Sequence, residues 1–246
     1  MDRVPRQLIA MGGGGFSMEP DNPALDLYVL AQTRTRRPSV CFLATATGDA
    51  DGYIERFYTA FKAHRCRPSH VPLFRRTPDL KQALLTQDVI YVGGGNTKSM
   101  LAVWRDWDVP RLLRRAWKNG TVLAGISAGA ICWFRMGVTD SWGKGLTGMP
   151  CLGFLPGTCC PHFDGEPERR PALHRLVTSR AVPSALALDD GAAAHFVERR
   201  LLRVVASRPD ARAYTVRRRG SSAVETALSV TPLRPNGQQA AASPFR

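Results

Sequence analysis

The sequence predicts an α/β fold in which a mostly parallel central sheet is flanked by helices. Short apolar segments typical of buried strands alternate with amphipathic segments typical of helices over residues 7–126. Several of the apolar segments end directly in glycine-rich turns. With 246 residues the chain is long enough to bury a full core. We therefore expect a single α/β domain over residues 1–234 and a polar, disordered tail over residues 235–246.

The first half of the chain supplies the predicted parallel sheet. Buried strands are expected at residues 7–11, 40–46, 88–92 and 121–124, with a short edge strand at 71–74. Helices are expected at residues 22–33, 51–64, 78–85, from about 96 onwards, at 110–118 and at 130–134. Because strands and helices alternate, the connections favour parallel pairing with helices on both faces.

The pattern becomes looser beyond Gly145. Residues 146–158 are rich in Gly and Pro and predict an ordered loop, and residues 167–179 predict a helix. Residues 186–189, 193–197, 201–206 and 213–217 predict strands, which we expect to be antiparallel. This part therefore predicts a small C-terminal antiparallel region beside the parallel sheet.

Composition narrows the functional classes. The 34 Lys and Arg residues exceed the 20 Asp and Glu residues, giving a net charge of +14, but the basic residues are spread along the chain without interleaved aromatics. Solvated basic faces therefore explain the charge better than nucleic-acid binding, which we consider unlikely. No apolar stretch is long enough to span a membrane or serve as a signal peptide, so a cytoplasmic protein without a membrane partner is expected.

Cysteine spacing gives no support for a metal site. The six cysteines include no C-x-x-C pair, and Cys159, Cys160 and His162 form too small a ligand set for zinc. Neither glycine-rich loop has the G-x-G-x-x-G or G-x-x-x-x-G-K-[ST] pattern of nucleotide-binding loops. We expect no metal and no organic cofactor.

The segment Gly125-Ile126-Ser127-Ala128-Gly129 predicts a nucleophile elbow. It follows an apolar strand and precedes a segment that can continue as a helix, which is the context that G-x-S-x-G requires. In such a turn the serine hydroxyl is exposed and the next backbone N–H faces the substrate oxyanion. The alternative is an ordinary glycine-rich turn in which Ser127 caps a helix.

Three further groups could complete a serine-dependent site. His162 stands in a loop and is the best placed of the five histidines to act as a base. Asp140 and Asp190 are both candidates for the acid, and spacing does not choose between them. The run 93–97 (Gly-Gly-Gly-Asn-Thr) could aim backbone N–H groups at an oxyanion or cradle a phosphate.

Three segments together resemble the aspartyl dipeptidase (peptidase E) family of serine peptidases, relatives of cyanophycinase. They are residues 90–97 (IYVGGGNT), 125–130 (GISAGA) and 161–163 (PHF). The resemblance extends over residues 7–230. It implies a three-layer sandwich like that of the glutamine amidotransferases, hydrolysis of short peptides with N-terminal aspartate, and no cofactor.

The resemblance also implies residue roles. They are Ser127 as nucleophile, His162 as base, Asp190 as the triad acid where the family often has glutamate, Asp140 as a further functional aspartate, Gly94 or Gly95 with Ala128 as oxyanion hole, and Asn96, Thr97, Arg169 and Arg170 as substrate-binding residues. An arginine fork suits a substrate carboxylate. Two alternatives stay open: a cyanophycinase-like peptide or isopeptide hydrolase, and a non-catalytic basic protein that binds nucleic acid. A homodimer is one option for the assembly.

Overall fold

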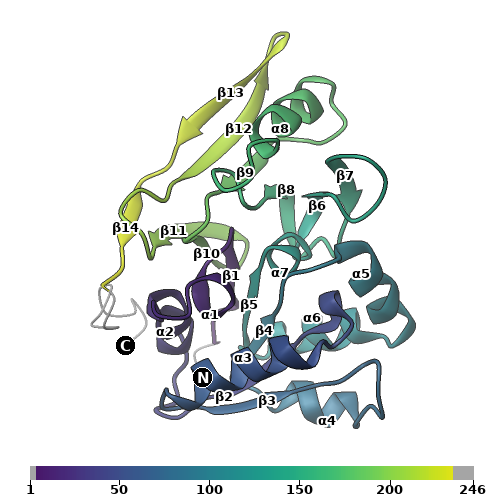
Figure 1. The fold of residues 1–246 in the computed structure, drawn as a ribbon, viewed down its shortest axis with the longest axis vertical. Helices are drawn as coiled ribbons and strands as arrows, with labels where there is room; N and C mark the ends of the chain where they lie inside the picture. Colours follow the sequence, from purple (N-terminus) through teal and green to yellow (C-terminus); the bar gives the residue numbers. More distant parts are fainter. Residues whose placement is uncertain (1–3, 235–246) are drawn as a thin grey trace.

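Two β-sheets and the helices around them make up the computed structural model, which describes residues 4–234 (Figure 1). The larger sheet has eight strands in the order β14 (Val230–Pro232), β11 (Arg200–Ala206), β10 (Ala192–Val197), β1 (Gln7–Met11), β5 (Val122–Ile126), β4 (Val89–Val92), β2 (Ser39–Leu43) and β3 (Arg67–His70). The smaller sheet has six, in the order β13 (Ser222–Ala227), β12 (Ala213–Arg219), β9 (Ala185–Leu188), β8 (Leu155–Cys160), β6 (Phe134–Thr139) and β7 (Thr147–Pro150).

The helices connect and cover these strands. They are α1 (Gly15–Met18), α2 (Ala24–Ala31), α3 (Asp51–Lys62), α4 (Leu80–Leu85), α5 (Thr97–Asp106), α6 (Val109–Lys118), α7 (Ala128–Ile131) and α8 (Arg169–Thr178), with a 3-10 turn at Thr45–Thr47. None of the helices within residues 4–234 has both the length and the apolar character needed to cross a lipid bilayer.

The larger sheet has the mostly parallel centre that the sequence predicts. Strand β1 pairs in parallel with β5, β5 with β4, β4 with β2, and β2 with β3. Strand β10 runs antiparallel to both β1 and β11, and so begins the antiparallel region on the other side. The predicted α/β class is therefore confirmed.

Side chains alternate between two cores across the larger sheet. On β4, Val89 and Tyr91 pack on one face, in a cluster with Phe16 of α1 and Phe57 of α3. Ile90 and Val92 point to the opposite face, in the cluster formed by α4, α5, α6 and the smaller sheet. Because both faces of the strand are covered, its sequence is continuously apolar.

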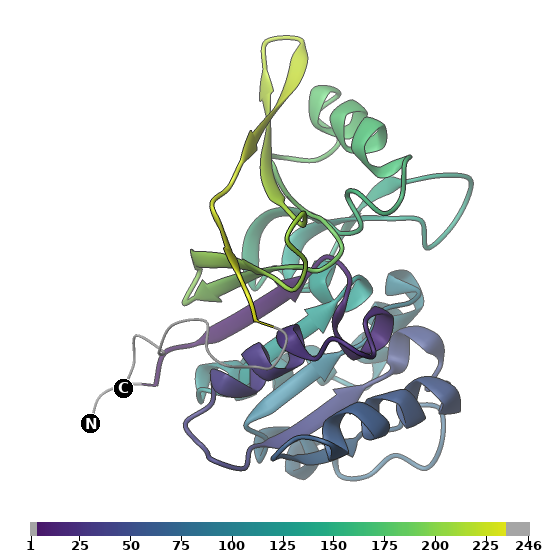
Figure 2. The same ribbon diagram turned by 60° about the vertical axis from the view of Figure 1, so that its left-hand side comes forward.

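The smaller sheet is mixed. Its inner strands β6, β8 and β9 are parallel, whereas β7, β12 and β13 join antiparallel at the edges. Helix α8 packs on this sheet through Leu173, Leu176 and Val177. The β12–β13 hairpin and α8 stand at the end of the molecule away from α3 (Figures 1 and 2).

Several predicted elements were wrong in detail. The expected loop 146–158 contains β7 and the first part of β8, because its backbone pairs with the neighbouring strand β6. The expected helix 130–134 stops at Ile131, and β6 starts at Phe134. A short apolar run such as 130–134 suits a buried helix or a buried strand equally well, so the pairing with β8 decides.

Other corrections concern strand positions. The edge strand expected at 71–74 lies earlier, as β3 at Arg67–His70. Strands β13 and β14 were not predicted. Strand β9 is antiparallel to β12, as expected, but pairs in parallel with β8 on its other side. The predicted tail, residues 235–246, lies outside the described residues.

Candidate active site

Ser127 lies at a sharp turn between β5 and α7. Its backbone has φ 55° and ψ −113°, a conformation rare for a residue with a side chain, and its N–H donates to the Met11 carbonyl at 3.1 Å. The flanking glycines are required by close approach: a Cβ added at Gly125 would lie 2.1 Å from the Gly129 oxygen, and one at Gly129 would lie 2.2 Å from the Val92 oxygen. The G-x-S-x-G pattern thus corresponds to a strained strand-to-helix turn.

Three predicted side chains form one hydrogen-bonded chain. His162 Nε2 lies 2.8 Å from Ser127 Oγ, and His162 Nδ1 lies 2.6 Å from Asp190 Oδ1. The His162 and Asp190 side chains are 12% and 15% exposed, so the pair is shielded from bulk water without being sealed off. Such an arrangement can accept a proton from the serine hydroxyl and stabilise the resulting imidazolium.

The smaller sheet brings His162 and Asp190 together. Strands β8 and β9 are parallel neighbours, so the segments that follow them leave the same edge of the sheet. The Phe163 N–H donates to the Leu188 carbonyl at 3.1 Å and fixes the two segments side by side. Adjacent carboxylates are then separated: Asp190 bonds His162, whereas Asp189 accepts from the Arg212 N–H at 2.8 Å.

Further residues that the sequence did not single out hold Asp190 in place. Asp164 Oδ1 accepts from the Asp190 N–H at 2.7 Å, and Asp164 Oδ2 accepts from Arg208 Nη2 at 2.8 Å. Arg208 Nη2 also donates to the Asp190 carbonyl. These contacts link positions 18–44 residues apart in the chain, so no local sequence motif predicts them.

Two glycines leave room for the Asp190 carboxylate. A Cβ at Gly13 would lie 1.9 Å from Asp190 Oδ1, and a Cβ at Gly165 would lie 2.1 Å from Asp190 Oδ2. Gly13 also forms an isolated parallel bridge with Asp190, which joins the end of β1 to the site. The carboxylate therefore fits between two backbone segments that tolerate no side chain.

Gly13→Ala is expected to lower peptidase kcat by about 10- to 100-fold, because the new methyl group must displace the carboxylate that orients His162. Steady-state kinetics with thermal unfolding measures this. Gly52→Ala is the matched control, since a Cβ there meets nothing within 4 Å. Wild-type kcat in a folded Gly13→Ala variant would show that the position of Asp190 does not matter.

The glycine-rich turn after β4 approaches Ser127. A Cβ at Gly94 would lie 3.2 Å from Ser127 Cβ. The Gly94 N–H already donates to Tyr53 Oη at 3.1 Å, whereas within residues 4–234 the N–H groups of Gly95 and Ala128 have no hydrogen-bond partner. Gly95 and Ala128 are thus the better candidates for an oxyanion hole.

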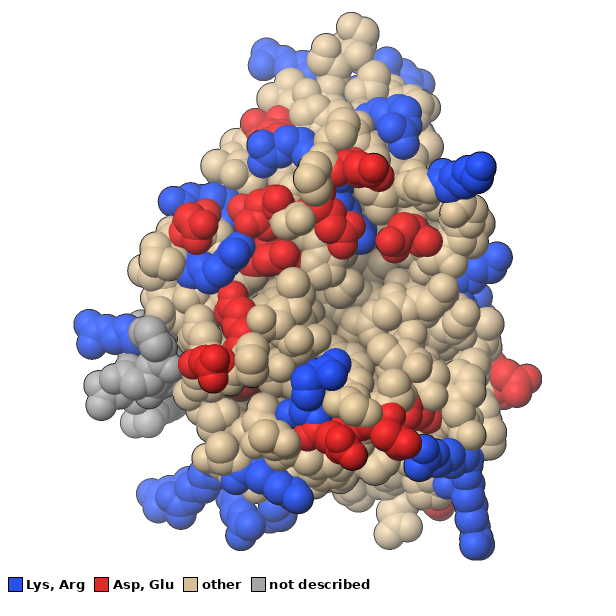
Figure 3. Space-filling model, viewed as in Figure 1, with Lys and Arg blue, Asp and Glu red and all other residues tan. Residues whose placement is uncertain are grey.

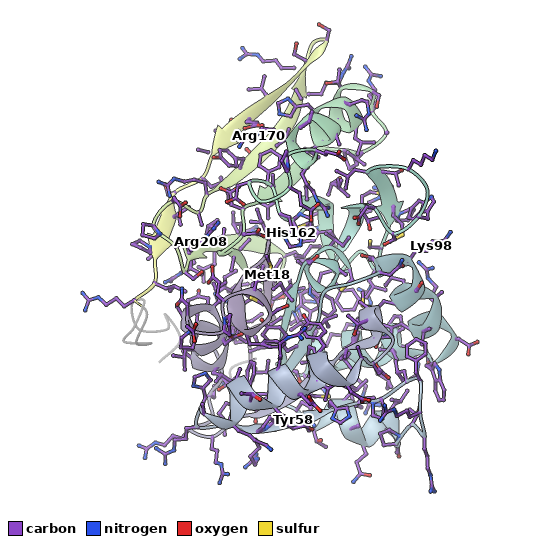
Figure 4. All side chains as sticks on the ribbon, viewed as in Figure 1. Met18, Tyr58, Lys98, His162, Arg170 and Arg208 are labelled. Atoms are coloured by element: carbon purple, nitrogen blue, oxygen red, sulfur yellow. The ribbon has the colours of Figure 1, made fainter. Side chains whose placement is uncertain are left out.

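A cavity of about 270 Å³ opens at Ser127 and His162. Its other lining residues come from α1 (Ser17, Met18), the 3-10 turn (Thr47), α3 (Tyr53, Arg56), β5 (Ile126) and the glycine turn (Gly94, Gly95). Met18 and His162 lie close together in Figure 4. On the face shown in Figure 3, the central hollow is lined mostly by residues that are neither basic nor acidic.

The structure does not bring Asp140 to His162. The Asp140 side chain is 67% exposed and lies 4.0 Å from Arg169 Nη2. Arg169 itself is buried and donates to Glu166 Oε2 at 2.7 Å and to the Val138 carbonyl at 3.2 Å. Arg170 stacks over Phe163, away from His162 (Figure 4).

Asn96 and Thr97 have structural contacts at the start of α5. The Asn96 side chain accepts from the Ser99 N–H and donates to the Ser141 carbonyl, both at 2.9 Å, and Thr97 is 1% exposed. Among the described residues, Asn96, Thr97, Arg169 and Arg170 are absent from the lining of the Ser127 cavity.

The remaining histidines lie elsewhere. His195 is buried between Tyr28 Oη at 2.7 Å and Gln7 Oε1 at 3.0 Å, and His174 pairs with Glu225 at 2.6 Å. His70 bonds Tyr58 Oη at 2.9 Å. His64 borders a different cavity, together with Asp26. This leaves His162 as the histidine in contact with Ser127.

A buried carboxyl anchors α1, which supplies Ser17 and Met18 to the cavity. Asp26 accepts from the Phe16 N–H at 2.7 Å and from Tyr91 Oη at 3.1 Å. Burial nevertheless raises the pKa of Asp26 from 3.8 to about 7. The folded chain therefore keeps a proton on this carboxyl through a range in which the unfolded chain has lost it.

Asp26 is expected to make the free energy of unfolding fall as the pH rises from about 4 to about 7, because the folded state binds the extra proton. Relative to the wild type, Asp26→Asn should become more stable by up to about 1.4 kcal/mol per pH unit across this window. Urea unfolding of both proteins at several pH values measures the difference. Parallel stability profiles would contradict a proton on Asp26. Burial also lowers the pKa of His195 to about 4, but His195 is common to both proteins and cancels.

A family profile and a related sequence both identify this chain as a peptidase of one family. The sequence profile of "Peptidase family S51" matches residues 8–204. The "Uncharacterized peptidase YgaJ" of Bacillus subtilis (strain 168) is 55% identical over 212 residues, which cover 86% of this chain and 92% of that protein.

Solved structures share the fold. The crystal structure of a peptidase from an acI-B1 Actinobacterium superposes with a TM-score of 0.70 at 16% identity, covering 95% of this chain and 98% of the other. A putative peptidase E protein from Listeria monocytogenes EGD-e superposes with a TM-score of 0.60 at 17% identity, covering 80% and 97%.

Proposed function

Because this chain belongs to peptidase family S51, we propose that it is a serine exopeptidase that hydrolyses short peptides with N-terminal aspartate. Family membership makes it a peptidase, and the serine mechanism and the substrate are the proposal. The observation that carries the mechanism is the unbroken chain of hydrogen bonds from Asp190 through His162 to Ser127. The aspartyl preference rests on the resemblance to peptidase E.

In the first half of the proposed reaction, Ser127 is acylated. Ser127 Oγ attacks the carbonyl carbon of the aspartyl residue while His162 Nε2 takes the hydroxyl proton. The N–H groups of Gly95 and Ala128 stabilise the tetrahedral oxyanion, each by about 3 kcal/mol in comparable sites. The C–N bond then breaks, and His162 returns the proton to the leaving amine.

In the second half, water releases the aspartyl group. His162 removes a proton from the water, whose oxygen forms the new bond to the acyl carbon. Collapse of this second tetrahedral intermediate breaks the ester bond, and the proton passes from His162 to Ser127 Oγ. Asp190 holds the His162 ring by its Nδ1 atom throughout and stabilises its positive charge.

The proposed preference for peptides with N-terminal aspartate can be tested with a panel of peptides. Wild-type protein is incubated with Asp-X, Glu-X and β-aspartyl dipeptides and with Asp-X at the start of a longer peptide, and the released amino acids and peptide fragments are identified and quantified. We expect the highest kcat/KM on short Asp-X peptides. Preferential cleavage of the β-aspartyl bond would favour the isopeptidase alternative, whereas cleavage inside long peptides would exclude an exopeptidase.

A further inference from the structure

We propose that Arg56 of α3 binds the side-chain carboxylate of the substrate's aspartyl residue and so determines the acidic specificity. This inference rests on the proposed function. It assigns the carboxylate to a residue outside the three family-like segments. The reasons are the place of Arg56 in the cavity, its lack of an acidic partner, and the contact that fixes its direction.

Arg56 supplies the permanent charge of the catalytic cavity. Among the described residues that line the cavity with Ser127, it is the one with a fixed positive charge, and the lining includes no Asp or Glu. Figure 3 shows acidic side chains above the central hollow and again along its lower rim, where basic side chains lie beside them. Within the cavity lining, the charge of Arg56 is therefore the one that attracts an anionic substrate group.

The guanidinium of Arg56 is unpaired. Its residue is exposed, and no carboxylate among residues 4–234 lies within ion-pair distance of it, whereas the buried Arg169 is already bound to Glu166. Arg56 also borders a second cavity, of about 340 Å³, that contains Asp26. The Asp26 oxygens are hydrogen-bonded to Phe16 and Tyr91 instead. Arg56 therefore keeps its donors available for a ligand.

An aromatic contact directs Arg56 towards the catalytic groups. Arg56 and Tyr53 are three residues apart on α3 and share a face of the helix. The guanidinium carbon lies 5.2 Å from the centre of the Tyr53 ring, and Tyr53 Oη accepts from the Gly94 N–H. The Tyr53 side chain thus contacts Arg56 through its ring and the glycine turn beside Ser127 through its hydroxyl group.

The test compares matched substrates in matched variants. Wild type, Arg56→Gln, Arg56→Lys and the control Lys62→Gln are assayed on Asp-X and on its neutral isostere Asn-X. Lys62→Gln removes an equal charge from the last turn of the same helix, outside the cavity. We expect Arg56→Gln to lower kcat/KM for Asp-X by about 30-fold and to leave Asn-X unchanged. Arg56→Lys should retain part of the Asp-X activity, and Lys62→Gln all of it.

Several outcomes would overturn the proposal. An unchanged ratio of Asp-X to Asn-X activity in Arg56→Gln would show that Arg56 does not recognise the carboxylate of the substrate's aspartyl side chain. A loss that disappears when the dipeptide has a C-terminal amide would place Arg56 at the terminal carboxylate instead. A wild-type enzyme that cleaves Asn-X as well as Asp-X would remove the specificity to be explained. None of these results contradicts the proposed role of Ser127. That role is tested separately, and retained activity in Ser127→Ala would contradict it.

Discussion

Replacing Ser127 with alanine is expected to lower kcat on an Asp-X dipeptide by on the order of 10⁶-fold. The change removes the oxygen that forms the acyl-enzyme while keeping Cβ and the turn that Gly125 and Gly129 allow. His162 loses its partner at 2.8 Å but keeps its bond to Asp190. Residual activity from the oxyanion donors alone should stay far below wild type.

Kinetics and thermal unfolding together make this result interpretable. Ser127→Ala should unfold close to the wild-type temperature, since the hydroxyl makes its hydrogen bond to the partly exposed His162. Ser221→Ala, in the exposed β12–β13 turn, is the matched control and should keep full activity. Activity within tenfold of wild type in a folded Ser127→Ala protein would exclude Ser127 as nucleophile.

Asp190→Asn is expected to lower kcat by about 10⁴-fold, comparable to the loss of the acid in other triads. An asparagine at this position can present an N–H to His162 Nδ1 and thereby favour the tautomer that cannot accept the serine proton. The substrate KM should change far less, because Asp190 is not among the residues that line the cavity.

Asp140→Asn is the informative comparison for Asp190→Asn. Asp140 is exposed and lies beside Arg169, so its loss should reduce kcat much less than the loss of Asp190. Equal effects of the two substitutions on kcat would contradict the assignment of the acid to Asp190. Both variants are compared with wild type by kcat and KM on the same dipeptide.

The sequence was informative where local chemistry determines local structure. Strands such as β4 and β5 are short, apolar and buried on both faces, so composition alone predicts them. The turn at Ser127 was also visible, because only glycine fits where the Gly129 and Val92 carbonyls approach. The contact between Gly125 and Gly129 is set within a few residues of chain, whereas the Val92 carbonyl comes from the neighbouring strand β4.

The smaller sheet was harder to predict because its strands depend on distant partners. Strand β7 has the sequence Thr-Gly-Met-Pro, which reads as a loop until it pairs with β6. The choice between Asp140 and Asp190 likewise needed the parallel pairing of β8 with β9. The spacing of residues along the chain does not predict that strand pairing.

Arg56 and the residues behind Asp190 were missed for a related reason. In the sequence, Arg56 is one of several basic residues and lies in a segment that predicts an amphipathic helix. Only the fold shows that this helix, α3, places Arg56 in the lining of the Ser127 cavity. Asp164 and Arg208 are 44 residues apart, yet they bond each other and the backbone of Asp190. Such contacts follow from the assembled fold.

Covalent labelling is the most direct test of a nucleophilic Ser127. Wild-type protein is treated with a fluorophosphonate, and the modified residue is located by peptide mass spectrometry. The proposed mechanism predicts one adduct, on Ser127, formed together with loss of peptidase activity, and greatly slowed labelling in His162→Ala. A protein that keeps hydrolysing peptides while Ser127 stays unlabelled, or that carries the adduct on another residue, would contradict it.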